Sequence, residues 1–408
     1  MVKYILLFLA VVMHIELAAQ KGNSKYVEGL FYFDQSPVRI EITNGKITNI
    51  LRIKELSEKK GGIYIAPGFI DNQVNGYNSV SFVEDSLTVK DIEKATRGLW
   101  QAGVTTYLPT VTTTDQRLLV KNLSILQQAK NDASLHGSIA GFHLEGPYLS
   151  PEDGYRGSHP LKFVRKPDWN EFMEMYEASG RNILQITLAP EIEGAMDFIS
   201  KCREKNIVVA IGHHNASTNQ VTEALDRGAQ IVTHLGNGLA NSINRHINPL
   251  WSQLSDDRLM ISIIGDGFHL LPEEIRVFYK VKGAGKTIIT SDVTHYAGML
   301  PGKYSTPEGD MIELTPEGAL LNLTQHVLFG SASPITKGVG HVMKVTGCTL
   351  AEAVQMSSTN PAHLYGLTDR GEIKNGMRAD LILFTIEDFK IQIKETIVAG
   401  EVVYESIK

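Results

Sequence analysis

Cysteine is scarce in this chain of 408 residues, which contains only Cys202 and Cys348. The two lie far apart and form no Cys-x-x-Cys pair, which excludes a disulfide framework and a thiolate metal site. We expect both to be buried and to pack as small apolar residues. Positive charge is also low, since 39 lysines and arginines face 45 aspartates and glutamates, for a net charge of −6. This balance argues against nucleic acid or an anionic membrane surface as the main partner.

Long apolar runs are lacking after residue 20, so no later segment is expected to cross a membrane. The first twenty residues differ from the rest: Lys3 precedes an apolar run at 5–13, and small residues lead to a polar break after Gln20. This order of charge, apolar core and small-residue exit is typical of a secretory signal peptide. We therefore expect residues 1–20 to direct export, to a periplasm. The alternative is an N-terminal helix that stays in the mature fold.

The composition, with 43% hydrophobic and 21% charged residues, suits one large enzyme-sized domain and a small one. Short apolar stretches separated by turns occur at both ends of the chain. Between two of them stands Asn44-Gly45, a strong hairpin signal. The sequence therefore predicts a small β-sandwich domain built from residues 21–66 and 374–408.

Between these ends, in residues 67–373, predicted strands alternate with predicted helices. Helical patterns occur, for example, at 89–102, 169–179, 219–228 and 273–281. Eight β-then-α units in a row favour a (β/α)8 barrel of the TIM type over an open sheet. A polar, hairpin-like insertion is predicted at 302–325, and two further helices at 336–346 and 349–357.

Side chains that bind metals lie at the ends of three predicted strands. Glu145 ends an apolar strand directly before a Gly-Pro break, and His213 and His234 end strands five and six. The strand ends of a barrel meet at its active-site face, and three nitrogen and oxygen ligands with one open position are typical of a catalytic zinc. The alternatives are a glutamate paired with Lys or Arg and hydrogen-bonded core histidines. His214 follows His213, and alternation lets only one face inward, which the strand-end position favours for His213.

Other strand ends and loops offer groups that move protons or orient a ligand. Asp292 ends predicted strand eight, where an inward carboxylate beside a metal-bound water can take its proton and later deliver it to a leaving amine. The alternative for Asp292 is a helix N-cap. His269 follows strand seven. His159 lies in a polar loop, 155–160, that is able to fold over the site, and the alternative is a surface histidine.

Six short motifs occur in a fixed order along the chain. They are Pro67-Gly68-Phe69-Ile70-Asp71, His143-Leu144-Glu145-Gly146-Pro147, Gly212-His213-His214-Asn215-Ala216, Thr233-His234-Leu235-Gly236-Asn237, Asp266-Gly267-Phe268-His269 and Ser291-Asp292. With the stretches 163–168 and 371–380, they resemble the motifs of the N-acetylglucosamine-6-phosphate deacetylases of the amidohydrolase superfamily. The resemblance covers the chain from residue 25 to its end.

The resemblance implies a hydrolase that removes the N-acetyl group from N-acetylglucosamine 6-phosphate or a closely related N-acetyl amino sugar. A divalent metal held by Glu145, His213 and His234 would activate water, and Asp292 would act as general base and then acid. His159 and His269 would orient the sugar and the developing oxyanion. The phosphate would meet backbone amides around Asn237 and Gly238. The residues implied to contact the substrate are His159, His269, Asn237, Gly238, Arg245, His246, Gln73 and Asn75. The resemblance also implies a homodimer.

Two regions depart from the family pattern. Many superfamily members carry His-x-His after strand one and hold a second metal there, whereas this chain has Gln73-Val74-Asn75. Neutral amides are poor ligands for a transition metal beside imidazole, which predicts one metal ion. We expect Zn²⁺, and Fe²⁺ or Mn²⁺ also accept this ligand set. Gly236, Gly238 and the segment 244–251 differ from the family's phosphate-binding region, so phosphorylation of the sugar stays open.

Two other functions fit the same residues. One keeps the barrel and hydrolyses a cyclic amide or an N-acyl amino acid. The other is an exported sugar-binding protein that has lost catalysis, and it predicts ligand binding without metal and without turnover.

Overall fold

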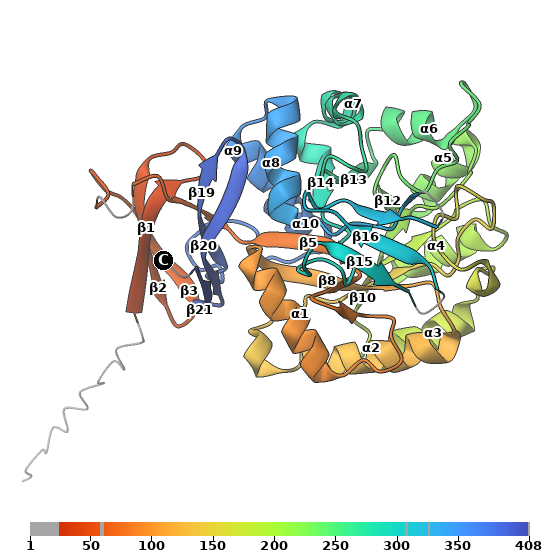
Figure 1. Ribbon diagram of the computed structural model, residues 1–408, viewed down its shortest axis with the longest axis horizontal. Helices are drawn as coiled ribbons and strands as arrows, with labels where there is room; N and C mark the ends of the chain where they lie inside the picture. Colours follow the sequence, from red (N-terminus) through yellow and green to blue (C-terminus); the bar gives the residue numbers. More distant parts are fainter. Residues whose placement is uncertain (1–23, 58–60, 307–308, 325–326, 407–408) are drawn as a thin grey trace, which may run out of the picture.

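The computed structural model describes residues 24–57, 61–306, 309–324 and 327–406. Its main part is a barrel of eight parallel strands in the order β14-β13-β12-β11-β10-β9-β8-β5. A sheet of seven strands, drawn in red and blue in Figure 1, lies beside the barrel. The predicted signal peptide, 1–20, lies outside the described residues. Within the described ranges, none of the helices has the length and apolar character to cross a membrane.

The predicted (β/α)8 barrel is confirmed. Its strands are β5 (Phe69–Val74), β8 (Val104–Thr112), β9 (Phe142–Glu145), β10 (Ile183–Leu188), β11 (Val208–Ile211), β12 (Ala229–Val232), β13 (Met260–Ile264) and β14 (Thr287–Thr290). The helices that follow them are α1 (Val89–Gln101), α2 (Gln116–Lys130), α3 (Trp169–Ala178), α4 (Ala195–Glu204), α5 (Thr218–Arg227), α6 (Pro249–Ser255), α7 (Pro272–Lys282) and α8 (Ile335–Thr346). The strands are almost wholly buried on both faces, as expected where helices cover a parallel sheet.

Several helices begin where the sequence offers a capping side chain. Thr88 and Asp91 form a reciprocal capping box at the start of α1, and Ser217 and Gln220 form another at α5. Asp168 accepts two backbone N–H groups at the start of α3. These caps satisfy N–H groups that the first helical turn leaves without partners, and so determine where each loop from a strand end passes into its helix.

The barrel closes between β14 and β5 through the side chain of Asp71. Its Oδ1 accepts hydrogen bonds from Thr290 Oγ1 at 3.0 Å and from the Ser291 backbone N–H at 3.2 Å, and its Oδ2 accepts one from the Ser291 hydroxyl. Val74 and Val293 add an isolated parallel bridge near the strand ends. Burial raises the pKa of Asp71 to about 6, against the opposing effect of these donors.

We expect Asp71→Ala to lower the free energy of unfolding by about 2–4 kcal/mol, because buried donors on Thr290 and Ser291 would lose their acceptor. Asp71→Asn keeps one acceptor oxygen and should lose less. Guanidinium-induced unfolding of the three proteins measures the difference. An unchanged unfolding midpoint in Asp71→Ala would show that the barrel closes by other contacts.

The seven-stranded sheet joins the two ends of the chain. Its order is β21-β20-β19-β4-β1-β2-β3. The strands are β1 (Ser24–Phe31), β2 (Pro37–Thr43), β3 (Lys46–Arg52), β4 (Tyr64–Pro67), β19 (Leu381–Glu387), β20 (Lys390–Val398) and β21 (Glu401–Glu405). Buried Ile40, Ile42, Ile65, Leu381 and Ile397 belong to one apolar core, so both chain ends build the small β-domain, as the sequence predicted. The domain limits at 66 and 373 stay predictions.

The predicted hairpin turn at Asn44-Gly45 connects β2 to β3. Both residues have positive φ, 51° and 76°, which is the backbone that two-residue hairpin turns require. A Cβ on Gly45 would lie 2.6 Å from the carbonyl oxygen of Ala399, so this close approach between the two chain ends needs glycine.

The insertion after β14 is larger than the predicted hairpin. It forms an antiparallel four-stranded sheet of β15 (Gly302–Ser305), β16 (Met311–Leu314), β17 (Leu320–Asn322) and β18 (Val327–Leu328). It packs on its own apolar cluster, which includes Ile312, Leu320 and Tyr296. Figure 1 shows β15 and β16 in teal across the front of the barrel. The two helices predicted next correspond to α8 and to α9 (Leu350–Val354), which continues into a π-helical turn.

Candidate active site

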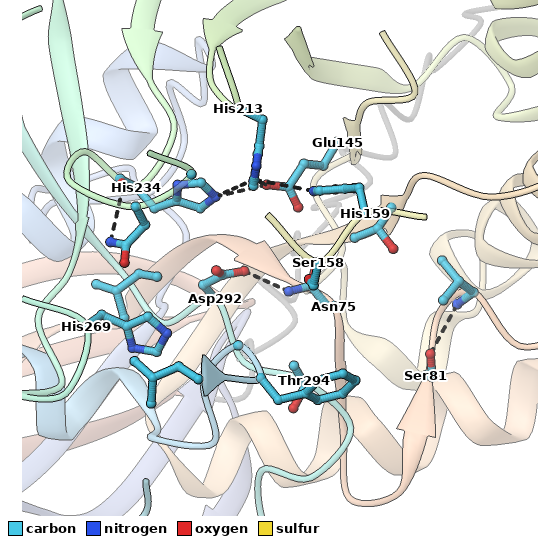
Figure 2. A pocket seen from close by; sticks show the side chains of 18 of the residues that line it. Asn75, Ser81, Glu145, Ser158, His159, His213, His234, His269, Asp292 and Thr294 are labelled. Carbon is cyan, nitrogen blue, oxygen red and sulfur yellow. Dashed lines mark hydrogen bonds and ion pairs between the residues drawn. The ribbon is translucent and has the colours of Figure 1, made fainter. Parts of the chain in front are cut away.

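Polar side chains gather at the carboxyl-terminal ends of the barrel strands around a cavity of about 380 Å³. Figure 2 shows His213, His234, Glu145 and Asp292 directed toward the same space. Among the residues predicted from sequence, those that line the cavity are Asn75, Glu145, His159, His213, His234, Asn237, Gly238, His269 and Asp292. Residues from distant parts of the chain therefore meet where a (β/α)8 barrel places its active site.

Three of these residues share an unusual backbone. His213, His234 and Asp292 follow β11, β12 and β14 and have φ of 54°, 33° and 51°. The left-handed region is unfavourable for residues with a Cβ, and such strain persists where the surrounding structure over-determines it. The backbone thus turns sharply at the end of each strand, at the points where these side chains enter the cavity.

Glu145, His213 and His234 form one compact group. Glu145 Oε1 lies 3.1 Å from His234 Nε2 and 3.4 Å from His213 Nε2, and the two Nε2 atoms are 3.1 Å apart. All three side chains are buried. Among the described residues this is the only group of three such side chains with ligand atoms close enough to share an ion.

The hydrogen-bonding state of His213 fits a metal ligand. Its Nδ1 lies 3.0 Å from the carbonyl oxygen of Tyr155, and a carbonyl only accepts, so Nδ1 carries the hydrogen and Nε2 offers its lone pair to the group. Burial acts to raise the pKa of Glu145, but its close contacts with the rings of His213 and His234 hold it well below its usual value. A carboxylate and two imidazoles in this state are a suitable ligand set for a divalent cation.

Gln73 and Asn75 turn their amide NH₂ groups toward carboxylates. Gln73 Nε2 donates to Glu145 Oε1 at 2.9 Å, and Asn75 Nδ2 donates to Asp292 Oδ1 at 2.7 Å. Burial, followed by the negative charge of Glu145, raises the pKa of Asp292 to about 7. The amides therefore act as donors that orient two carboxylates, and Asp292 is able to hold and release a proton near neutral pH.

His159 folds over the site, although it comes from a loop. It is 7% exposed, its Nδ1 lies 2.9 Å from Thr113 Oγ1, and its Nε2 lies 3.3 Å from His213 Nε2. On the other side, Gly238 has φ of 63°, and a Cβ there would lie 2.9 Å from His213 Nδ1. Glycine at 238 thus lets the loop approach the ring of His213.

Three other histidine and arginine side chains lie away from the cavity. Arg245 and His246 are exposed on the loop before α6 and are not among the residues that line it. Their predicted contact with a phosphate stays a prediction. His214 points elsewhere: its Nδ1 accepts the Ala216 backbone N–H at 3.1 Å, and its Nε2 contacts Gln253. His213, and not its neighbour, therefore belongs to the group that could hold a metal ion.

Sequence reasoning missed several residues that line the cavity. They are Ser81, Val83, Thr112, Ile264, Thr294, His295 and 328–330, whereas Ser158 and Pro160 belong to the loop that was predicted to fold over the site. Thr112 ends β8 and could have been found from that position. The apolar wall formed by Val83, Leu328 and Phe329 comes partly from the insertion, and a single sequence carries no signal that the insertion returns to the site.

Fold and site together define a hydrolase barrel of the amidohydrolase type, and residues 64–403 match the Amidohydrolase family. The chain is 31% identical over 352 residues to the N-acetylglucosamine-6-phosphate deacetylase of Danio rerio, across 83% of this chain and 84% of that relative. It belongs to the N-acetylglucosamine-6-phosphate deacetylase family of the amidohydrolase superfamily, which confirms the resemblance seen in the motifs.

Two further comparisons extend this result. The N-acetylgalactosamine-6-phosphate deacetylase of Escherichia coli O157:H7 is 28% identical over 345 residues, covering 84% of this chain and 89% of its own length. The crystal structure of N-acetylglucosamine-6-phosphate deacetylase from Thermotoga maritima aligns with a TM-score of 0.82 at 28% identity, over 94% of this chain and all of that one. The small β-domain and the barrel therefore recur together in a solved relative.

Proposed function

We propose that this protein is a metal-dependent deacetylase that hydrolyses the acetamide of N-acetylglucosamine 6-phosphate or of a closely related N-acetyl amino sugar. The products are acetate and the amino sugar. The observation that carries the proposal is the buried group of Glu145, His213 and His234 beside Asp292 in one cavity. Relatives named for two epimeric sugar phosphates support the class of substrate.

In this proposal Glu145, His213 and His234 hold one divalent cation, with Zn²⁺ preferred and Fe²⁺ or Mn²⁺ as alternatives. Bound there, the cation supplies a Lewis acid that lowers the pKa of water to about 7 and polarises a carbonyl. Asp292 accepts the proton of the attacking water and then passes it to the nitrogen of the leaving amine. Asn75 holds Oδ1 of Asp292, which leaves the other carboxylate oxygen for this transfer.

Other side chains orient the sugar. We assign His159 and His269 to the two walls beside the reacting acetamide, and the backbone around Asn237 and Gly238 to the distal end of the sugar. All four line the cavity. Export to a periplasm, with residues 1–20 as the signal peptide, and a homodimer are further parts of the proposal. The charge and apolar pattern of the first twenty residues supports the former, and the family resemblance supports the latter.

The zinc-loaded protein is expected to release acetate from N-acetylglucosamine 6-phosphate, with the galactosamine epimer and unphosphorylated N-acetylglucosamine as comparison substrates. An enzymatic acetate assay measures this, and a cyclic ureide and an N-acetyl amino acid complete the panel. Turnover of the ureide or the amino acid without acetate release from any sugar would favour the second hydrolase function. Sugar binding without turnover, unaffected by chelators, would favour the non-catalytic function.

A further inference from the structure

The loop after β13 contains a buried carboxylate that takes no part in the steps above. Asp266 lies two residues beyond β13 and is 4% exposed. Its Oδ1 accepts the backbone N–H groups of Phe268 at 2.9 Å and His269 at 3.1 Å, and its Oδ2 lies 2.9 Å from His269 Nδ1. The carboxylate thus fixes both the backbone and the ring of His269, with one oxygen for each.

The state of this carboxylate determines where the hydrogen of the imidazole lies. Burial acts to raise the pKa of Asp266, but the hydrogen bond with His269 holds it below its usual value. An ionised carboxylate has no hydrogen to donate, so Nδ1 of His269 carries the hydrogen. The other ring nitrogen, Nε2, is then left for the cavity, which His269 lines together with Asp292 (Figure 2).

The turn that carries this pair is held from behind by α8. Gly267 has φ of 83°, and a Cβ there would lie 3.2 Å from the ring of His341 on α8. Lys337, also on α8, places its Nζ 3.9 Å from the centre of the Phe268 ring. These contacts hold the turn against α8 on one side, while Gly267 itself is exposed. The hydrogen bond to Asp266 holds the ring of His269 within this turn.

We propose that Asp266 is a positioning residue for the deacetylation: it keeps the hydrogen of His269 on Nδ1 and holds the ring so that the lone pair of Nε2 accepts a hydrogen bond from a hydroxyl group of the sugar. The inference rests on the proposed function and deepens it. Asn at position 266 would keep its oxygen for the two backbone N–H groups and turn its NH₂ toward Nδ1. A donor there cannot accept the Nδ1 hydrogen, so the ring changes tautomer or turns away.

Steady-state acetate release by Asp266→Asn, His269→Ala and the double variant tests this. We expect Asp266→Asn to lower kcat/KM by about 10- to 100-fold, the loss typical when the partner that orients a functional histidine is removed. The double variant should be no slower than His269→Ala, because Asp266 acts only through that ring. The proposal would be overturned if the double variant were slower than His269→Ala by the full loss seen in Asp266→Asn. It would also be overturned if Asp266→Asn kept the wild-type kcat/KM.

A matched control and a second readout separate positioning from folding. Asp168 also accepts two backbone N–H groups, from Asn170 and Glu171, but contacts no histidine, so Asp168→Asn should keep wild-type kcat/KM. The ¹⁵N spectrum of the imidazoles, assigned with His269→Ala, should show Nδ1 of His269 protonated in the wild type and not in Asp266→Asn. If the wild type releases no acetate, the proposed function fails. Independently, an unprotonated Nδ1 of His269 in the wild-type spectrum would refute the proposed role of Asp266 in holding that hydrogen.

Discussion

Replacing Asp292 with Asn is expected to lower kcat for acetate release by at least about 100-fold, because an amide cannot accept the proton of the attacking water. The fold should stay intact. Asn tolerates the left-handed backbone at 292, where φ is 51°, and its oxygen can still accept the hydrogen bond from Asn75. Wild-type turnover in this variant would remove Asp292 from the mechanism.

The same variant should be more stable than the wild type when both are metal-free. Burial and Glu145 raise the pKa of Asp292 from 3.8 to about 7. A carboxyl group with a raised pKa in the folded state stabilises it fully below the unfolded pKa, and this contribution is lost as pH rises through the folded pKa. The advantage of Asp292→Asn in thermal midpoint should therefore grow between pH 4 and pH 7 and be largest above about 7.

Asp388 provides a control for both measurements. It also has positive φ, 45°, but it is exposed between β19 and β20, far along the chain from the site. Asp388→Asn should leave kcat unchanged and give no gain in thermal midpoint that grows over this pH range. An equal, pH-independent gain in both variants would mean that the backbone preference of Asn, and not the buried charge, causes the effect.

His234→Asn is expected to abolish metal retention and to lower acetate release by about 1,000-fold or more, since a metal supplies several kcal/mol of transition-state stabilisation. Removing His234 leaves only Glu145 and His213 of the candidate ligand group, and two ligands no longer match the three protein ligands of a catalytic zinc site. Asn accommodates φ of 33° at this position. Metal analysis after dialysis and the acetate assay measure the two losses.

Chelation of the wild type should reproduce both losses and also lower the thermal midpoint, because a ligand bound only to the folded state stabilises it. Added Zn²⁺ should restore wild-type activity and stability but not those of His234→Asn. His363, an exposed histidine paired with Glu372 at 3.2 Å, provides the control: His363→Asn should keep its metal. One ion per chain retained by dialysed His234→Asn would exclude His234 as an essential ligand.

Much of the fold could be predicted from the sequence because the apolar patterns of its strands and of its helices are both regular. Alternating strands and helices predicted the barrel, and short strands at both ends predicted the joint β-domain. Strand ends also predicted where Glu145, His213, His234 and Asp292 would meet, since parallel strands in a barrel bring their carboxyl ends to one face. The choice between His213 and His214 followed from the same reasoning.

The remaining features depend on side-chain direction and on loops, which one sequence does not encode in a readable pattern. No signal in the sequence indicates that His213, His234 and Asp292 have positive φ, because residues other than glycine seldom do. The importance of Asp266 appears only when its two oxygens are seen to face one turn. Arg245 and His246 were selected by motif position, and that position does not show whether a side chain faces the cavity or solvent.

The shared sheet has a consequence for biosynthesis. In this seven-stranded sheet β4 lies between β1 and β19. The N-terminal strands of the sheet, β1 to β4, leave the ribosome first, and its C-terminal strands, β19 to β21, leave it last. Throughout synthesis of the barrel, the edge of β4 that β19 will cover presents free N–H and C=O groups, the kind of edge that pairs with other chains. The nascent polypeptide thus exposes the edge of β4 until its final strands, β19 to β21, have been synthesised. Completion of the sheet therefore requires complete translation of the chain.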